Sequence, residues 1–351
     1  MYKAKYKKYI LNFKQPSGTS RGVLTEKLTY YILIWNDENP YQVGIGECSI
    51  LKGLSIDDVN NYESILEDVC SNIDNYIEET NSKLIAFPSI IFGIETAVKD
   101  LENKGTRILF QSDFTDGIEG IPVNGLIWMG SIGFMKEQLR DKVEEGFRCI
   151  KIKIGAIEFE EELKFLINLR KEYPENYFEI RLDANGAFSL TEVKEKLRRL
   201  SKYKIHSIEQ PVKQGNWTAM ANLCKESPVP IALDEELIGV NTYSKKEELV
   251  ATILPQYLIL KPSLLGGFKH CKEWIEIADK YKVGWWVTSA LESNIGLNAI
   301  AQWVFTLNSK LPQGLGTGQL YTNNIASPLL IEDTKLWYLG RGWNVERIEE
   351  S

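Results

Sequence analysis

The sequence is poor in the residue types on which many enzyme sites are built. It contains two histidines among 351 residues, His206 and His270, too few for a histidine base together with several histidine ligands. Five cysteines are scattered along the chain, and no two of them stand in Cys-x-x-Cys spacing: Cys48, Cys70, Cys149, Cys224 and Cys271. An odd, scattered set argues against a zinc or disulfide framework and fits a reducing compartment. The chemistry must therefore fall to carboxylates and lysines.

The chain also lacks the features of secreted, membrane-spanning and nucleic-acid-binding proteins. No apolar run is long enough to cross a bilayer. The apolar stretch 9–13 that follows the basic N-terminus ends at Lys14, so it is too short for the core of a signal peptide. A net charge of −7 gives no electrostatic support for nucleic-acid binding. We therefore expect a cytoplasmic protein whose partner is a small molecule, with neither nucleic-acid nor membrane contacts; a homo-oligomer stays open.

The composition, 44% hydrophobic and 25% charged over 351 residues, allows one large domain and a smaller one. In the first 120 residues strands precede helices. Runs rich in β-branched and aromatic residues predict strands at 28–35 and 41–48. Ser55 fits the N-cap of a helix over 56–79, and apolar residues spaced three and four apart over 91–101 predict a second helix. This order is typical of an α+β module.

From residue 121 onward, short apolar runs alternate with stretches of helical periodicity. Repeated strand–helix units favour a parallel sheet closed into a barrel. The alternative, a doubly wound open sheet, lacks a Gly-x-Gly-x-x-Gly motif after its early strands. Helices are expected at 160–170, 190–200, 269–281 and 295–304. Strands are expected at 121–126, 149–154, 178–183, 206–209, 230–234, 257–261 and 283–289, and a degenerate eighth unit ends at 314–318.

Three carboxylates close three successive expected strands. The intervals between Asp183, Glu209 and Asp234 are 26 and 25 residues. This is about one strand–helix unit, since roughly 250 residues make the eight units of a barrel. The three acids should stand side by side at the C-terminal mouth, where their oxygens suit Mg²⁺, with Asn185 and Glu235 in support. The alternative is that each acid is only a helix cap or a loop residue.

Two lysines alternate with isoleucines in the expected strand 149–154. A barrel strand packs its outer face under helices, so the isoleucines suit the outside and Lys151 and Lys153 point inward. An inward lysine is costly unless it is paired, and beside acids and a metal it can act as a base. Lys261 closes a strand 27 residues after Asp234 and should face Lys153 across the mouth. The alternatives are an edge strand with solvated lysines and, for Lys261, a surface lysine before a proline turn.

Several segments of the chain resemble a known family. The second half contains KIKIG, RLDANGAF, IEQP, ALDEE, ILKPSLLGG and TSALESNIGLNAIAQW, and the first half contains GIGE and PSIIFGIETAVKDL. This set resembles the muconate-lactonizing branch of the enolase superfamily and, with GLGTG at 314–318, its o-succinylbenzoate synthases more closely. The resemblance implies an α/β fold with a modified (β/α)₇β TIM-like barrel over 121–327. It also implies an N-terminal α+β capping domain over 1–120, which the tail 328–351 completes.

The resemblance also implies roles for the site residues. Mg²⁺ would be held by Asp183, Glu209 and Asp234, Lys153 would be the general base, and Lys261 would stay protonated on the opposite face. The implied reaction is the Mg²⁺-dependent dehydration of 2-succinyl-6-hydroxy-2,4-cyclohexadiene-1-carboxylate to o-succinylbenzoate in menaquinone biosynthesis. A proton leaves the carbon next to the carboxylate, and the enediolate charge that develops must be stabilised.

Substrate contacts are expected from the barrel interior and from loops that act as a lid, 17–23 and 53–54. Arg181 lies two residues before Asp183 in the same expected strand, so its side chain should also face inward, one layer deeper. The alternative for Arg181 is a buried structural ion pair. For Arg21 the alternative is a surface loop without any substrate contact. The candidate substrate-binding residues are Lys151, Arg181, Ser289, Gly316 and Arg21.

Two other functions stay open on the sequence alone. An N-acylamino acid racemase or dipeptide epimerase would use the same metal with both lysines as acid and base. The epimerases commonly carry Asp-x-Asp where residues 289–293 read SALES. A non-catalytic carboxylate-binding relative would be expected to lose a metal ligand or a lysine, and none is missing. The loop 48–54 departs from the family pattern of prolines and a bulky aromatic, which puts the substrate contacts of the cap in question rather than the chemistry.

Overall fold

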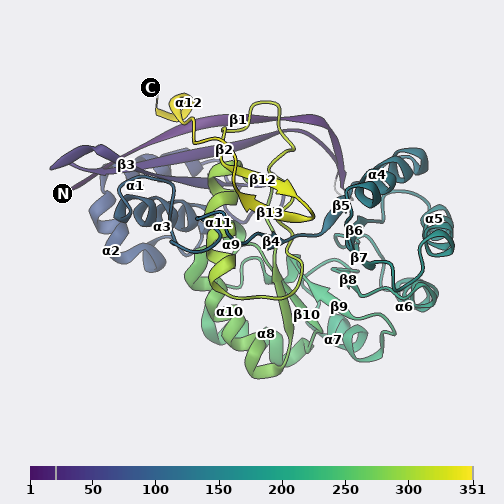
Figure 1. The fold of residues 1–351 in the computed structure, drawn as a ribbon. Coiled ribbons are helices and arrows are strands. Elements are labelled where there is room, and N and C mark those ends of the chain that lie inside the picture. The colour runs from purple at the N-terminus through teal and green to yellow at the C-terminus, as the bar shows by residue number, and fades with distance from the viewer. Residues whose placement is uncertain (20–21, 350–351) are drawn as a thin grey trace.

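A computed structural model describes residues 1–19 and 22–349 of the chain (Figure 1). Within these ranges the strands form a three-stranded N-terminal sheet, a seven-stranded sheet, and a three-stranded sheet that joins the middle of the chain to its C-terminal region. The seven-stranded sheet is parallel throughout, and helices follow its strands, so the protein has an α/β fold. Among the helices so described, none combines the length and apolar character needed to cross a membrane.

The N-terminal sheet is antiparallel and carries helices on one face. Its strands are, in order, β1 (Tyr2–Thr19), β2 (Gly22–Asn36) and β3 (Asn39–Ser49). The helices are α1 (Tyr62–Ser71), α2 (Ile73–Lys83) and α3 (Pro88–Glu102). A buried cluster joins sheet to helices through residues such as Ile32, Leu66 and Ile94. We call these six elements the N-terminal module.

The first two strands form a long ribbon that reaches from the N-terminal helices to β5 (Gly125–Ile127) (Figure 1). A β-bridge between Gly18 and Met129 fixes its far end. The pairing of β1 with β2 shifts register between Asn12 and Ser17. Pro16, which lies in this gap, has no N–H to donate to the ladder. The ribbon is therefore regular along its inner part and interrupted before its tip.

Close backbone contact joins β3 to α3. A Cβ added at Gly46 would lie 1.9 Å from the carbonyl oxygen of Gly93, and one added at Gly44 would lie 2.0 Å from that of Ala97. Real Cβ atoms do not approach backbone oxygens so closely, so only glycine allows the strand to lie this near the helix. The GIGE segment is thus explained by packing at its two glycines.

The N-terminal module corrects several predictions. Strands predicted at 28–35 and 41–48 are confirmed within the longer β2 and β3, but β1 is not predicted from its mixture of lysines and tyrosines. The prediction of one helix over 56–79 with Ser55 as N-cap is wrong, because α1 begins at Tyr62 and α2 follows separately. Tertiary contacts hold the preceding turn: the Asp57 carboxylate accepts the N–H of Ser89, 2.9 Å away, near the start of α3.

The parallel sheet runs in the order β11-β10-β9-β8-β7-β6-β5. After β5, its strands are β6 (Cys149–Lys153), β7 (Glu179–Asp183), β8 (Ser207–Glu209), β9 (Ile231–Leu233), β10 (Tyr257–Leu260) and β11 (Gly284–Val287). The helices are α4 (Ile132–Glu144), α5 (Phe159–Glu172), α6 (Val193–Leu200), α7 (Trp217–Glu226), α8 (Tyr243–Ile253), α9 (Pro262–Leu265), α10 (Gly267–Tyr281) and α11 (Asn294–Thr306).

A short segment after α11 touches both edges of this sheet. The N–H of Gly314 donates to Val287 O at 2.8 Å, beside β11. The N–H of Gln313 donates to Pro122 O at 2.8 Å, and the carbonyl of Gln313 accepts from the N–H of Asn124 at 3.0 Å, just before β5. The two edges of the seven-stranded sheet are therefore linked through residues 313–314.

The predicted strands 149–154 to 283–289 are confirmed as β6 to β11, and the helices predicted at 160–170, 269–281 and 295–304 are confirmed as α5, α10 and α11. The strand predicted at 121–126 is wrong as one element. It divides into β4 (Ile121–Pro122), which pairs with β13 (Lys335–Tyr338), and β5 in the parallel sheet. The helix predicted at 190–200 begins only at Val193 as α6.

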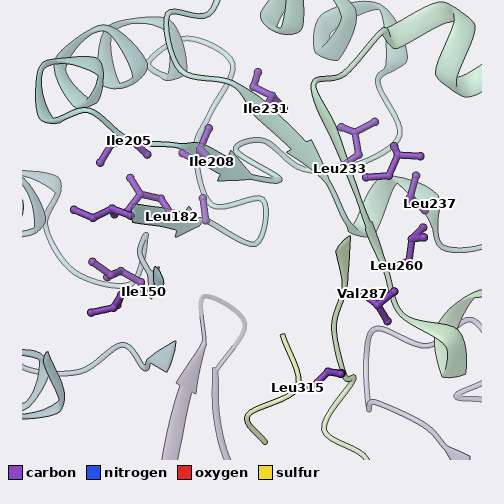
Figure 2. Close-up of a cluster of buried hydrophobic side chains, with 14 of the residues drawn as sticks. Ile150, Leu182, Ile205, Ile208, Ile231, Leu233, Leu237, Leu260, Val287 and Leu315 are labelled. Atoms are coloured by element: carbon purple, nitrogen blue, oxygen red, sulfur yellow. The ribbon is translucent and has the colours of Figure 1, made fainter. Parts of the chain in front are cut away.

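The main hydrophobic core lies between the outer face of the parallel sheet and its helices. Figure 2 shows the strand contributions: Ile150, Leu182, Ile208, Ile231, Leu233, Leu260 and Val287. Because side chains alternate along a strand, Ile150 and Ile152 are fully buried in this core, and Lys151 and Lys153 face the opposite side. The packing of two isoleucines therefore directs two lysines into the interior.

Two carboxylates of the N-terminal module, buried Glu47 and partly buried Glu95, cap helices of the parallel-sheet region. Glu47 accepts the N–H groups of Ser293 and Gly296, both at 2.9 Å, at the start of α11. Glu95 accepts the N–H of Phe268 at 2.5 Å, at the start of α10. The first N–H groups of a helix have no partner within it and form its positive end, so a carboxylate is well placed there.

The chain ends by returning to the N-terminal module. The hairpin of β12 (Leu329–Glu332) and β13 is followed by α12 (Glu346–Glu349), which lies near β1 in Figure 1. Ile348 shares a buried cluster with Tyr31 and Leu33 of β2.

A methyl group at the contact between β3 and α3 should destabilise the fold. We expect Gly46→Ala to lower the free energy of unfolding by about 1–3 kcal/mol, because the clash is with backbone and must be relieved by separating strand from helix. Gly342→Ala is the matched control, since a Cβ there meets nothing within 4 Å. Urea denaturation of both variants measures the difference, and equal stabilities would contradict this account of the contact.

The Glu95 cap should make stability depend on pH. Burial raises the pKa of Glu95 to about 7 despite two backbone N–H donors and nearby lysines, against 4.5 for an ordinary glutamate. Between these values the folded state binds more protons than the unfolded state, so stability falls as pH rises. Relative to Glu95→Gln, the wild-type protein should lose roughly 3 kcal/mol from below pH 4.5 to above pH 7. Denaturation of both proteins across this range tests the effect, and parallel curves would refute it.

Candidate active site

Lys151 lies between two carboxylates of neighbouring strands. Its Nζ is 2.7 Å from Glu209 Oε2 and 2.9 Å from Asp183 Oδ2. Asp183 ends β7 and Glu209 ends β8, and the two residues are direct partners in the parallel register. The lysine side chain is 10% exposed and the carboxylates 1% and 2%. The cluster is therefore buried, and its charges compensate one another instead of being solvated.

Lys153 lies two residues further along β6, at its C-terminal end. Its Nζ is 2.9 Å from Asp183 Oδ2 and 2.8 Å from Asn185 Oδ1. The ring of Trp128, just after β5, lies 5.7 Å from the same ammonium group, a distance at which the face of an indole attracts a cation. Lys153 is thus held between a carboxylate, an amide and an aromatic face.

Lys261 approaches the carboxylates from the other side. It follows β10 directly and forms an ion pair with Asp234, the residue that follows β9. The backbone N–H of Asp234 donates to Gln210 Oε1 at 3.3 Å, which orients the end of β9. Strands β7, β8 and β9 lie between the strands of Lys153 and Lys261. The two lysines therefore flank a row of three acids, as the spacing in the sequence predicts.

Burial and charge act against each other in this cluster. Burial lowers the pKa of Lys151 and of Lys261, but the surrounding carboxylates outweigh it and hold both pKa values above that of an ordinary lysine. Burial raises the pKa of Asp183, but the three lysines outweigh it and hold that pKa well below the usual range. For Glu209, burial and the charge of Asp183 prevail and raise the pKa to about 8. Glu209 is therefore the carboxylate of the cluster whose burial the neighbouring lysines offset least.

Side chains around the cluster fix its geometry. Asn185 donates from Nδ2 to Glu235 Oε1 at 3.0 Å, and its backbone N–H donates to Asp183 Oδ1 at 3.1 Å. It does so with φ at +44°, a left-handed conformation that asparagine tolerates better than most residues. Both expected supporting residues, Asn185 and Glu235, thus contact each other behind the acids. Ser289 contacts Thr317, with 2.6 Å between the two hydroxyl oxygens.

A cavity of about 790 Å³ opens over this cluster. It is lined by Lys151, Lys153, Asp183, Asn185 and Lys261 from the strand ends, and by Ser289 and Gly316 from the loops after β11. The N-terminal module contributes two segments, residues 22–24 beside the ribbon tip and residues 51, 52 and 54. Gly22, Val23 and Leu54 belong to the loops 17–23 and 53–54 that the sequence predicts as a lid, whereas Leu24, Leu51 and Lys52 lie beside them.

One expected substrate contact, Arg181, is not found at this cavity. Arg181 faces inward as its parity predicts, but it is not among the described residues that line the cavity. Its Nε is 2.7 Å from Glu179 Oε1, its Nη1 donates to Pro312 O at 2.9 Å, and its guanidinium lies over Trp286. The alternative that the sequence left open, a buried structural ion pair, describes this arrangement. Arg21 lies outside the described residues.

The sequence also left some of the lining unidentified. Trp128 was not singled out, although a tryptophan directly after a barrel strand would have been a usable signal. Leu291 also lines the cavity, with φ at +63°, and its carbonyl accepts a hydrogen bond from the Tyr321 hydroxyl at 2.7 Å. A left-handed leucine is strained, and no pattern in the sequence indicates it. Such residues are recognised only when the loop conformation is known.

The chemistry of the three acids fits a hard divalent cation. Within the described residues, no three acidic, histidine or cysteine side chains form a complete ligand group, and lysine ammonium groups lie against the carboxylates. However, Glu209 Oε1 is buried and has no hydrogen-bond partner in the described part of the chain. A buried carboxylate oxygen without a donor is destabilising, and a cation would satisfy it. Carboxylates from three neighbouring strands are the ligands that Mg²⁺ prefers.

The chain is similar to proteins of known activity over most of its length. Residues 134–339 match the family model described as enolase C-terminal domain-like. The o-succinylbenzoate synthase of Desulfotalea psychrophila is 44% identical over 93% of this chain and 96% of that protein. The crystal structure of MenC from Desulfotalea psychrophila LSv54 aligns with a TM-score of 0.84 at 40% identity, covering 96% of this chain and 99% of that one. An N-succinylamino acid racemase of Thermus thermophilus is 33% identical over 44% of this chain and 39% of that protein.

Removing the central ammonium group should destabilise the folded protein. We expect Lys151→Met to cost about 3–5 kcal/mol, because Asp183 and Glu209 would then be buried side by side without it. Lys151→Met combined with Glu209→Gln should recover part of this loss, since the pair is removed together. The control Lys245→Met breaks an exposed pair with Glu248 and should change stability by less than about 1 kcal/mol. Equal losses for Lys151→Met and Lys245→Met in urea denaturation would disprove the role assigned to Lys151.

Proposed function

The chain belongs to the enolase superfamily, and from this we propose that it removes water from 2-succinyl-6-hydroxy-2,4-cyclohexadiene-1-carboxylate to give o-succinylbenzoate, a step of menaquinone biosynthesis. The relative that carries the name of this activity is 44% identical and extends over nearly the whole chain. The observation that carries the proposal is the position of Lys153 and Lys261 on either side of the row of acids.

We propose further that the parallel strands close into a modified (β/α)₇β barrel over residues 121–327. The hydrogen bonds of residues 313–314 to both edges of the sheet support this closure. In the same proposal, residues 1–120 and the tail 328–351 form a capping domain. The contacts of Glu47, Glu95 and Ile348 between these regions support it.

Asp183, Glu209 and Asp234 are the residues that would hold Mg²⁺. When bound, the ion acts as a Lewis acid that stabilises negative charge on the carboxylate of the substrate. Asn185 and Glu235 maintain the position of Asp183 through the hydrogen bonds described above. Lys151, between Asp183 and Glu209, keeps two like charges close together at the end of the strands.

Lys153 carries the proton transfers in this proposal. Its Nζ, as the free amine, takes the proton from the carbon next to the carboxylate, and the electron pair of that C–H bond moves toward the carboxylate oxygens. The pair then returns to form the new double bond of the ring as the C–O bond to the hydroxyl group breaks. Lys153 returns the proton to the departing oxygen, and water and the aromatic product result. Lys261 stays protonated on the other face and stabilises the negative charge that develops. Ser289, the backbone at Gly316, and Arg21 are proposed to contact the substrate.

A 1,1-proton transfer, as in an N-acylamino acid racemase, is the second candidate. It is favoured by one observation: each face of the site has a lysine paired with a different acid, Lys153 with Asp183 and Lys261 with Asp234. Such a reaction needs both lysines as acid and base. A non-catalytic carboxylate-binding relative is the third candidate. The three acids and two lysines that the proposed reaction needs are all present, which argues against it.

An absorbance assay of o-succinylbenzoate formation tests the main proposal. We expect turnover with Mg²⁺ and its loss in excess EDTA. Lys153→Ala should lower kcat by about 10²–10⁴-fold, since that is the usual contribution of an acid–base group. The control Lys164→Ala changes an exposed residue of α5 and should leave kcat unchanged, while circular dichroism reports folding.

Appreciable activity in Lys153→Ala would contradict the assignment of Lys153 as the base. Full activity in excess EDTA would contradict the requirement for Mg²⁺. The racemase alternative predicts that an optically pure N-succinylamino acid is racemised. Racemisation should require both lysines, one on each face, whereas dehydration requires proton transfer by Lys153 alone.

A further inference from the structure

Much of the lining of the cavity is apolar. Lys151, Lys153 and Lys261 line it where the strands end, each paired with a carboxylate. The neighbouring lining side chains come from the N-terminal module and from loops, and they carry no charge: Leu24, Leu54, Trp128, Leu291 and Leu320. A matching ligand therefore has a ring or hydrocarbon chain along this apolar lining, and in the proposed function its ring carboxylate would lie toward the cation held at the strand ends.

Another side of the same cavity is negative. The charged lining residues beside α4 and the β12–β13 hairpin are Asp141, Lys142, Glu145, Glu332 and Asp333. Lys142 is paired with Glu145 at 2.6 Å, so four carboxylates and one ammonium leave a net charge of −3 there. A second anionic group on a ligand is repelled from this side.

Lys52 is the remaining cation of the lining. Of the five lysines in the described part of the lining, it alone forms no ion pair, since Lys142, Lys151, Lys153 and Lys261 are each paired with a carboxylate. Lys52 is exposed to solvent as well as lining the cavity. An unpaired ammonium group there is available to a ligand.

The backbone that carries Lys52 is held firmly. The N–H of Leu54 donates to Leu51 O at 3.0 Å, and the N–H of Leu51 donates to Ser55 Oγ at 2.8 Å. The N–H of Gly53 donates to Asp58 Oδ2 at 2.7 Å, and Gly53 has φ at +73°, which a side chain would strain. The turn thus fixes the position of the Lys52 backbone, from which its long side chain extends. This is the segment in which the sequence departs from the family pattern.

We propose that Lys52 binds the second carboxylate of the substrate, the one at the end of the succinyl chain. The inference rests on the proposed function, because the dehydration substrate has one carboxylate on its ring and another on its chain. The ring carboxylate lies toward the row of acids and lysines, the ring and chain lie against the apolar wall, and the distal carboxylate meets Lys52. Lys52 is then a residue that selects dicarboxylates over monocarboxylates.

Steady-state kinetics of the full chain with Mg²⁺ test this. Lys52→Met should raise KM about 10-fold and leave kcat within about 2-fold, because the contact is made equally in substrate and transition state. Lys52→Arg keeps the charge and should restore most of the affinity. Lys245→Met is the control: it removes an exposed lysine that is not among the described residues lining the cavity and should leave KM unchanged.

Calorimetric binding to the Mg²⁺-loaded protein provides a measure that does not depend on turnover. The probes are o-succinylbenzoate and 2-butyrylbenzoate, which keeps the ring carboxylate, ketone and chain length but lacks the distal carboxylate. Lys52→Met should weaken the first about 10-fold and leave the second unchanged. The preference for the dicarboxylate should also weaken as ionic strength rises.

Equal KM and equal binding in wild-type protein and Lys52→Met would overturn the inference. The sequence predicts a carboxylate contact for Arg21. The inference would therefore also be overturned if Arg21→Met, and not Lys52→Met, raised KM and weakened the binding of o-succinylbenzoate. Absence of turnover in the wild-type protein would overturn the proposed function, and the two binding probes would still decide the role of Lys52.

Discussion

Buried ion pairs between lysines and carboxylates, at the ends of the parallel strands, are the interaction on which the site depends. A buried charge is costly alone, and each member of the cluster is retained because its partners compensate it. Lys151 is central, since it contacts Asp183 and Glu209 together. Its direction is set by packing: a shift of β6 by one residue would place Ile150 inside and both lysines under the helices. The chemistry of the site thus depends on the hydrophobic core of the sheet.

The N-terminal module is positioned by contacts that also position the strand ends. Glu47 caps α11, the helix that follows the loop of Ser289, and Glu95 caps α10, which lies just beyond Lys261. Displacing the module would therefore leave the N–H groups of both helices without acceptors. The residues that cover the cavity and the residues at its base share the same anchors, so their spacing is maintained although they are far apart in the sequence.

The parts of the site that follow from strand periodicity could be predicted from the sequence. Asp183 and Lys153 are examples. Alternation along a strand determines which face their side chains occupy, and the length of a strand–helix unit places them at the C-terminal ends of their strands. Arg181 shows the limit: its parity indicates the correct face, but only the structure shows that it pairs with Glu179 away from the cavity. The start of α1, the strand β1 and the exposure of Lys52 to the cavity depend on contacts between distant segments. No local pattern contains that information.

The interrupted pairing in the β1–β2 ribbon has a mechanical consequence. Between Asn12 and Ser17 the ladder loses its regular hydrogen bonds, partly because Pro16 has no donor. In this gap the backbone of β1 pairs with the C-terminal region instead: the N–H of Lys14 donates to Leu320 O at 2.8 Å, and the N–H of Thr322 donates to Asn12 O at 2.9 Å. Leu320 also lines the cavity. The break in the ladder is therefore where the ribbon is tied to the wall of the cavity.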